Sequence, residues 1–188
     1  MPVRGGRGGG AAHISVGDRM GNAAALSVSN GEGCGHILPI GNFMLNNMLG
    51  EEDLNPNGFF QWQPDCRITS MMSPTLVRRD NGGILALGSG GSNRIRSAIL
   101  QVLLNHLCLD LSLGEAIEAP RIHLEQELLH IEDGHDGETV RQMMAEFPAH
   151  QIWPDRNFFF GGVHGAAFDP DSGIFSAAGD PRRGGSVG

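Results

Sequence analysis

The sequence predicts an α+β fold in which layered sheets carry helices on their outer faces. Two observations lead to this class. Short apolar segments occur in pairs joined by turn-forming residues, which is typical of antiparallel hairpins. A longer segment with apolar residues at three- and four-residue spacing separates these pairs, which is typical of an amphipathic helix. The 188 residues suffice for one domain with a sizeable core, and 40% of them are hydrophobic.

The N-terminal half is predicted to contain two hairpins. Residues 1–10 are a glycine-rich, low-complexity leader that we expect to be disordered, so the predicted domain spans residues 11–188. The first hairpin pairs residues 13–18 with 23–29 around a turn at 18–22, and a short strand is expected at 43–47. The second hairpin pairs residues 70–78 with 84–89 around the turn at 80–83.

The C-terminal half is predicted to alternate helices and strands. Ser92 or Asn93 can cap a long helix that ends near Asp110, and Pro120 ends a short helix over Leu113–Glu118. The apolar face of the long helix consists of Ile95, Ala98, Ile99, Val102, Leu103 and His106. Further elements are expected as a strand at 122–132, a helix at 137–147, and a last hairpin pairing 162–168 with 174–178.

Charge and composition argue against several classes of partner. The formal net charge of −8 and the scattered basic residues disfavour nucleic-acid binding, which relies on clustered Lys and Arg. No apolar run reaches the roughly 20 residues that span a bilayer, and the N-terminus lacks the apolar core of a secretory signal. These features leave the localisation open. The three cysteines and eight histidines show no metal-type spacing, so we expect neither a metal site nor another cofactor.

Five segments, taken in order, carry a resemblance to a known family. The first runs from Ala11-Ala12-His13-Ile14-Ser15-Val16 through Asp18, Gly21 and Asn22. The others are Leu45-Asn46-Asn47-Met48, Ser70-Met71-Met72-Ser73-Pro74-Thr75, Gly88-Ser89-Gly90-Gly91-Ser92-Asn93-Arg94-Ile95 and Gly179-Asp180-Pro181-Arg182. Each is weak alone, but together they resemble the small subunit of the gamma-glutamyltranspeptidases over residues 11 to about 183.

The resemblance implies a fold and an activity. The implied fold is the four-layer αββα sandwich of N-terminal-nucleophile hydrolases, of which this chain would form the small-subunit portion. The implied activity is acyl transfer or hydrolysis of a gamma-glutamyl amide such as glutathione, in which an N-terminal threonine acts as nucleophile and its own amine as base. Ala11 stands at the threonine position and lacks the hydroxyl, so the chain as written is expected to be inactive.

The same family pattern implies an oxyanion hole before the long helix. A Gly-Gly turn leading into a helix N-terminus offers two unhindered backbone N–H donors, and Gly90-Gly91 fits that role. The family loop reads Gly-Ser-Pro-Gly-Gly-Ser-Arg, whereas this chain reads Gly-Ser-Gly-Gly-Ser-Asn-Arg, which leaves open by one residue which amides face the site. The alternative is a tight strand-to-helix connection without a ligand.

Three further positions correspond to the family's substrate contacts. A Thr/Asn pair after the second strand falls at Ser29, with Asn30 beside it. An acidic residue after Asn-Asn-Met falls at Glu51, or at Asp53 if the loop carries an insertion, and would oppose the substrate ammonium. The alternative for these carboxylates is a solvated acidic turn. Of the family's serine pair, Ser70 is present and Met71 replaces the second hydroxyl.

Three interpretations of the whole chain follow. It is the catalytic small-subunit part of such an enzyme, a non-catalytic relative that binds a gamma-glutamyl ligand or a partner, or a fragment that folds only with a missing complementary chain. The third interpretation predicts exposed apolar surface, because the family's core is shared between subunits. The expected partner is therefore a large-subunit-like chain or a second copy of this one.

Overall fold

The computed structural model describes residues 11–188, so the predicted leader at 1–10 lies outside the described residues. The central sheet has the order β3-β4-β8-β9 and is antiparallel throughout. Its strands are β3 (Thr75–Arg78), β4 (Ile84–Gly90), β8 (Gly162–Asp169) and β9 (Ile174–Ala178). A separate hairpin pairs β1 (Ala11–Gly17) with β2 (Ala23–Ser29). The two predicted N-terminal hairpins and the last hairpin are thus present.

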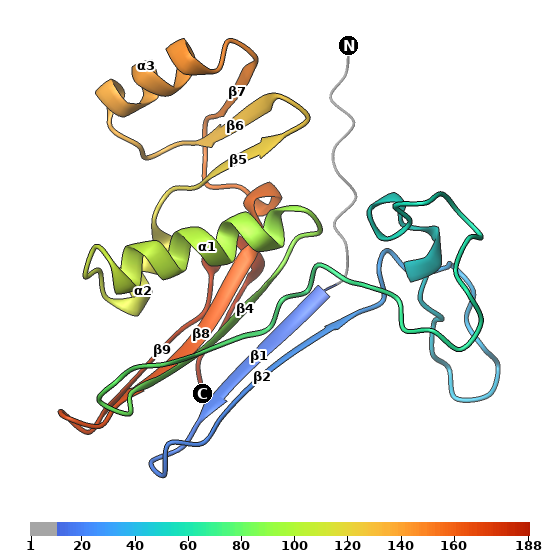
Figure 1. Ribbon diagram of the computed structural model, residues 1–188, viewed down its shortest axis with the longest axis horizontal. Helices are drawn as coiled ribbons and strands as arrows, with labels where there is room; N and C mark the ends of the chain where they lie inside the picture. The colour runs from blue at the N-terminus through green and yellow to red at the C-terminus, as the bar shows by residue number, and fades with distance from the viewer. Residues whose placement is uncertain (1–10) are drawn as a thin grey trace.

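The described residues form three layers (Figure 1). The β1–β2 hairpin packs against β4 and β8 on one face of the central sheet. Helices α1 (Arg94–Leu107) and α2 (Leu113–Glu118) cover the other face. The core lies between these helices and the sheet, where Leu85, Leu87 and Val163 meet Ile95, Ala98, Ile99, Val102 and Ile117. The predicted apolar face of the long helix is therefore the face that is buried, with Leu103 packed at its margin.

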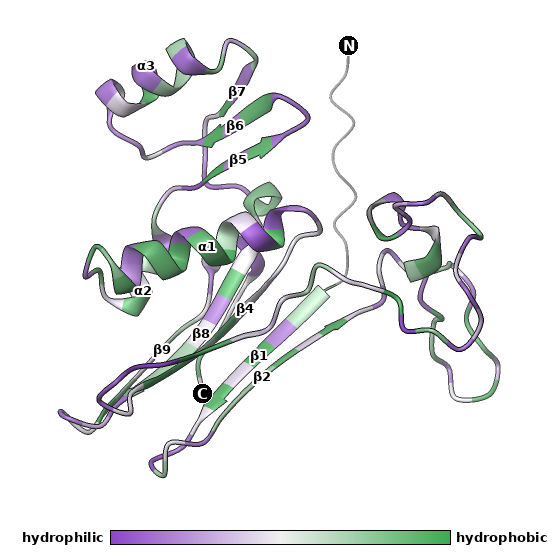
Figure 2. Ribbon diagram, viewed as in Figure 1, coloured by the Kyte–Doolittle hydropathy of each residue, from purple (hydrophilic) through white to green (hydrophobic). Residues whose placement is uncertain are grey.

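The β1–β2 hairpin has an unusual distribution of side chains across its two faces. Small and polar residues such as Ala11, His13 and Ser15 face the central sheet, whereas the bulky aliphatic residues face outward. Hydrophobic and hydrophilic residues accordingly alternate along β1 in Figure 2. On the outward face, Ile14, Val16, Leu26 and Val28 are all more than half exposed. A sheet that buries one face normally places its aliphatic side chains there, whereas this hairpin carries them on its outward face.

A smaller unit follows the helices. It contains β5 (Ile122–Glu125), β6 (Leu128–Glu132), α3 (Gly137–Glu146) and β7 (His150–Trp153), with β6 antiparallel to β5 and parallel to β7. The single strand expected at 122–132 is wrong, because Gln126 and Glu127 both adopt positive φ and turn the chain back on itself. Such turns favour Gly or Asn, neither of which is present here to signal it.

The segment between β2 and β3 is largely irregular. Its regular elements are the 3₁₀ turns η1 (Met48–Gly50) and η2 (Glu52–Leu54). The strand expected at 43–47 is wrong, since Met44 forms only an isolated bridge with Ile37. The strand expected from residue 70 begins at Thr75 instead. Two more 3₁₀ turns, η3 (Phe158–Phe160) and η4 (Pro181–Arg183), flank the C-terminal hairpin.

A buried cluster of four charges joins the smaller unit to the central sheet. Arg121 Nη2 lies 2.7 Å from Asp180 Oδ2, and Arg182 Nε donates to Glu132 Oε1 at 2.8 Å. All four side chains are at most 2% exposed. The carboxylates also accept backbone N–H groups, from Val163 to Asp180 and from Arg121 to Glu132. Two positive and two negative charges therefore balance in a site from which water is excluded.

Removing one carboxylate from this cluster should unfold the chain more easily. We expect Glu132→Gln to lower the free energy of unfolding by about 3–5 kcal/mol, because it leaves an uncompensated buried guanidinium. The matched control is Glu138→Gln, whose partner Arg141 lies in an exposed pair, and it should cost less than about 0.5 kcal/mol. Urea denaturation measures both. A similar loss of unfolding free energy in the two variants would contradict a large stabilising contribution from the buried cluster.

Candidate functional site

A cavity of about 400 Å³ opens where the start of β1, the end of β2, the η1–η2 segment and the start of α1 meet. Five of the predicted site residues line it: Ala11, Ser29, Glu51, Ser70 and Met71. These positions come from four separate stretches of the chain. The structure thus places the nucleophile position beside most of the residues expected to contact substrate.

Of the two other predicted substrate residues, the structure places only the Asn30 side chain. Asn30 is exposed, and its Nδ2 donates to the Met44 carbonyl at 3.3 Å, so it supports the loop without lining the cavity. The backbone of Asp53 belongs to η2, but its side chain lies outside what the structure describes. Glu51 lines the cavity, and the choice between Glu51 and Asp53 stays a prediction.

The glycine loop contributes Ser92 to the lining of the cavity. Gly90 ends β4 and packs against the backbone of Ala11, where an added Cβ would lie 2.9 Å from the Ala11 oxygen. Gly91 packs against Gly161, and among the described residues of this loop it is Ser92 that lines the cavity. Ser92 adopts a φ of +52°, a conformation that glycine favours. Which amides of this loop face the site stays a prediction.

The start of α1 also differs from expectation. Asn93 occupies the N-cap position, yet its side chain makes no cap hydrogen bond. Its Nδ2 instead donates to Glu125 Oε1 at 2.6 Å. Asn93, which could have capped the helix with its side chain, thus contacts the smaller unit instead.

A turn at the end of β2 shapes one wall of the cavity. Ser29 Oγ accepts the Gly31 N–H at 2.9 Å, and Gly31 adopts a φ of +63°. A Cβ at Gly31 would clash with the Asn47 and Glu51 side chains. Asn47 Oδ1 in turn accepts the Glu32 N–H at 2.7 Å. Glycine at position 31 therefore lets the Glu51 carboxylate reach the cavity.

Sequence reasoning missed several residues that line the cavity. The most informative are Asn47, Ser92 and Arg94, all of which lie inside motifs that carried the family resemblance. The Arg94 guanidinium lies 4.8 Å from the centre of the Phe159 ring, and its Nε donates to the Phe159 carbonyl at 3.1 Å. The sequence motif around Arg94 could have identified it as a cation of the site. The motif could not have given the orientation of its guanidinium, which depends on the contact with Phe159, far away in the sequence.

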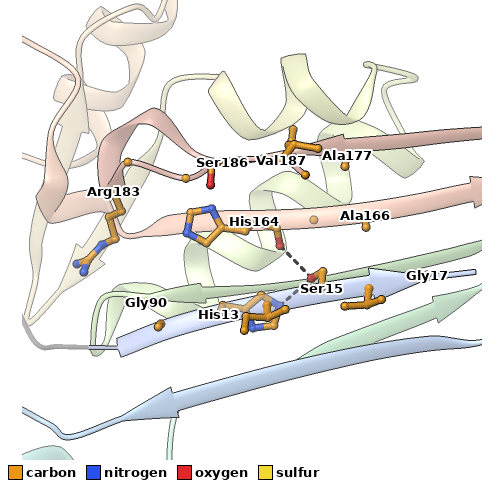
Figure 3. A pocket seen from close by; sticks show the side chains of 18 of the residues that line it. His13, Ser15, Gly17, Gly90, His164, Ala166, Ala177, Arg183, Ser186 and Val187 are labelled. Carbon is orange, nitrogen blue, oxygen red and sulfur yellow. Dashed lines mark hydrogen bonds between the residues drawn. The ribbon is translucent and has the colours of Figure 1, made fainter.

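A second groove of about 1030 Å³ runs along the other side of β1, between β8, β9 and residues 183–188 (Figure 3). His13 points into the interior here and is 8% exposed. Its Nδ1 pairs with Ser27 Oγ at 2.7 Å and its Nε2 with Ser15 Oγ at 2.8 Å, while Ser15 Oγ donates to the His164 carbonyl. A Cβ on Gly88 would overlap the imidazole. His13 is thus a hydrogen-bonded core histidine.

Burial lowers the pKa of His13 to about 4, with a smaller contribution from His164. The imidazole is therefore neutral at pH 7, and Ser15, whose hydroxyl hydrogen is directed at the His164 carbonyl, is not activated by it. The arrangement supports packing of β1 on the sheet rather than nucleophilic chemistry.

The fold identifies the structural class to which this chain belongs. The described layers are the small-subunit part of an N-terminal-nucleophile hydrolase fold, as solved structures show. The chain resembles the acivicin-inhibited gamma-glutamyltranspeptidase with a TM-score of 0.78 and 27% identity, over 92% of this chain and 98% of that one. It resembles a threonine-to-alanine mutant of the Helicobacter pylori gamma-glutamyltranspeptidase with a TM-score of 0.77 and 29% identity, over 90% and 98%. The predicted fold class is confirmed.

Residues 4–188 match the family described as gamma-glutamyltranspeptidase, and the chain belongs to that family. It is 29% identical over 178 residues to the glutathione hydrolase proenzyme of Bacillus subtilis strain 168, which covers 93% of this chain and 30% of that relative. It is 28% identical over 168 residues to the acylase ACY 1 proenzyme of Pseudomonas sp. strain SE83, over 88% and 30%. The chain therefore spans less than a third of the length of these relatives.

Among the side chains that the structure describes, no group of three or more His, Cys, Asp or Glu is arranged to hold a metal ion. None of the helices described is long and apolar enough to cross a membrane.

The buried state of His13 should make stability depend on pH. Its folded-state pKa of about 4 lies below the ordinary value of 6.5. The unfolded chain therefore binds more protons between these values, and the free energy of unfolding should fall as pH drops from about 6.5 to about 4, by at most about 3 kcal/mol from this group. Urea denaturation across this range measures the change.

Burial also lowers the pKa of His123, His130 and His164, so the whole chain should lose more than His13 alone accounts for. His13→Asn isolates the contribution, because the variant should lose stability less steeply in the same range. Identical pH dependence in the two proteins would exclude a neutral buried His13.

Proposed function

We propose that this chain is a non-catalytic gamma-glutamyl-binding member of its family. The observation that carries the proposal is the position of Ala11, which lines a cavity together with residues suited to an α-amino acid group. A methyl group cannot attack a carbonyl, and Ala11 follows Gly10 in the sequence as it stands, so its nitrogen is an amide rather than the free amine that would act as base.

The charges around the cavity support recognition of a glutamyl group. Glu51 supplies the counter-charge for the substrate ammonium, with Ser29 as a neighbouring hydroxyl. Ser70 offers one hydrogen bond to the α-carboxylate, and Met71 takes the place of the second hydroxyl. Arg94, anchored on Phe159, adds positive charge on the same wall. The chain can thus bind a gamma-glutamyl compound such as glutathione although it lacks the nucleophile.

The role of Gly90 and Gly91 changes under this proposal. Gly90 positions Ala11 through their close backbone contact, and Gly91 allows the loop to pass Gly161. Ser92 lines the cavity and is a further candidate for the position of an oxyanion donor beside the Gly90-Gly91 pair.

The chain should not cleave a gamma-glutamyl anilide above a buffer blank. Loss of a nucleophile in other hydrolases lowers turnover by about 10⁶-fold. A version that begins at residue 11 and carries Ala11→Thr should regain measurable release of the chromogenic amine, because it restores both hydroxyl and free amine. The measurement is absorbance of the released amine.

The matched control for that experiment begins at the same residue and carries Ala12→Thr. It has the same composition, but its hydroxyl lies on the outward face of β1, so it should stay inactive. Robust turnover by the unmodified chain would overturn the non-catalytic proposal.

L-glutamate should raise the melting temperature by binding the folded state. At ten times its dissociation constant the expected gain is about 3–6 °C for a chain of this size. Glu51→Ala should remove most of the gain, since it deletes the counter-charge for the ammonium. Glu127→Ala, an exposed carboxylate in the β5–β6 turn, should keep it. Differential scanning fluorimetry measures all three, and an unchanged melting temperature at saturating glutamate would contradict the assignment.

A partner for the outward face of the β1–β2 hairpin forms the second part of the proposal. Ile14 and Leu26 lie opposite each other in the pairing register, and Val28 extends the strip they form. We assign this face to a large-subunit-like chain, in keeping with the proenzyme relatives, with a second copy of this chain as the alternative. Exposed aliphatic strips of this kind mark interaction surfaces.

The chain purified alone should self-associate at micromolar concentration through this strip. Leu26→Asp should shift it toward monomer, because a carboxylate opposes burial of the face. Ile174→Asp, at a similarly exposed aliphatic position on β9, should not. Sedimentation velocity distinguishes the species. A wild-type chain that is monodisperse and monomeric would exclude the need for a partner.

A further inference from the structure

Arg94 brings a positive charge to the wall of the candidate cavity and is attached to Phe159 at two points. Its Cζ atom lies 4.8 Å from the centre of the Phe159 ring, and its Nε donates to the Phe159 carbonyl oxygen at 3.1 Å. The ring quadrupole attracts the cation, and the backbone bond restricts the plane of the guanidinium. The place of this charge therefore depends on Phe159.

Hydrogen bonds hold the backbone of Phe159 in turn. Phe159 lies in η3, where its N–H donates to Asn157 Oδ1 at 2.9 Å. The Asn157 N–H donates to Glu132 Oε1, also at 2.9 Å. Glu132 belongs to the buried cluster of four charges, so hydrogen bonds connect that cluster, through Asn157 and Phe159, to the Arg94 guanidinium.

Two rings of the smaller unit hold the Phe159 side chain. The Trp153 ring stacks on it, with ring centres 4.8 Å apart and planes 17° apart, and the His130 ring centre lies 4.5 Å away. Rings attract each other at these separations. Trp153 lies on β7 and His130 on its neighbour β6, so the Phe159 ring rests on side chains of a paired sheet.

A hydrogen bond fixes the orientation of Trp153. Its indole Nε1 lies 3.2 Å from His130 Nδ1. An indole N–H is a donor only, so Nδ1 is the acceptor and the imidazole is neutral in this pair. Burial is the largest cause that lowers the pKa of His130, and Arg94 lowers it further against an opposing effect of Glu125. The neutral form that the bond requires therefore predominates at pH 7.

We propose that Trp153 and Phe159 are positioning residues that give the cavity its selectivity for an α-carboxylate. They hold the Arg94 guanidinium at the cavity wall, where it pairs with the α-carboxylate of the bound group. Neither ring is among the described residues that line the cavity, so both act through Arg94. The inference rests on the proposed gamma-glutamyl binding and names the part of the ligand that these two residues select.

The carboxylate falls to Arg94 because the neighbouring groups suit it less. Glu51 is an anion, Ser70 has a single hydroxyl hydrogen, and Met71 has no hydrogen-bond donor. A guanidinium presents several N–H groups in one plane, in the geometry that a carboxylate accepts. A guanidinium whose position is fixed beforehand also loses less conformational freedom when it binds.

Isothermal titration calorimetry of the full chain, with any chain that copurifies with it, tests this at pH 7. The two probes are L-glutamate and gamma-aminobutyrate, which is glutamate without its α-carboxylate. Trp153→Leu and Phe159→Leu should each weaken L-glutamate binding by about three- to tenfold, the loss of one ring or cation–π contact, and leave gamma-aminobutyrate binding unchanged. Trp153→Phe keeps a ring and should retain most of the affinity for L-glutamate.

The matched control is Phe175→Leu. Phe175 also belongs to a stacked pair, with its ring centre 4.6 Å from that of Phe168, but this pair lies on β8 and β9 and does not line the cavity. This variant should change binding of neither probe. Equal loss of both probes in Trp153→Leu would mean that the rings only support the fold, and would overturn the inference.

Chemical modification tests the positioning without a ligand. Phenylglyoxal reacts with guanidinium groups, and mass spectrometry of the peptide that contains Arg94 measures the rate at that residue. Trp153→Leu should speed this modification by about threefold or more, because the guanidinium loses its support, whereas Phe175→Leu should not. An unchanged rate would overturn the inference whether or not glutamate binds. A faster rate in Trp153→Leu, with no binding of L-glutamate by the unmodified chain, would instead overturn the proposed function and the carboxylate role of Arg94.

Discussion

The buried cluster of Arg121, Glu132, Asp180 and Arg182 is the interaction on which the rest of this structure depends. It ties the C-terminal turn to the first two strands of the smaller unit and to the backbone of β8. Arg121 precedes β5 directly, so the cluster also sets the position of His123 and Glu125 over the start of α1. Each charge is stable in the interior only while its partners remain, which makes the arrangement all-or-none.

The candidate site depends on a different kind of constraint. Its walls come from irregular backbone between β2 and β3, held by side-chain-to-backbone hydrogen bonds such as those of Ser29 and Asn47. Its floor is the first residue of β1, pressed against Gly90. A family cavity can thus persist when the nucleophile changes, because Ala11 contributes little to holding its walls. Under the proposed function, binding can therefore be separated from catalysis.

The sequence predicted regular elements well where local signals were strong. The strands at Ala23–Ser29 and Ile174–Ala178 and the helix at Leu113–Glu118 have the expected bounds. The prediction failed where a long-range contact replaced a local signal. The β5–β6 turn carries Gln126 and Glu127 at positive φ, and β7 is held by parallel pairing with β6 across an intervening helix. Neither feature leaves a pattern in its own segment.

By itself, the sequence determined the family, the fold class and the absence of a hydroxyl at residue 11, because these follow from residue identities in a fixed order. It also identified Ser29, Glu51, Ser70 and Met71 as candidates for one site. Only the tertiary structure decided that Ser92 and Arg94 join these residues in the lining of the cavity, and that the Arg94 guanidinium packs on the Phe159 ring. Those outcomes depend on contacts between residues more than twenty positions apart. The periodicity of apolar residues and the spacing of motifs do not predict such contacts.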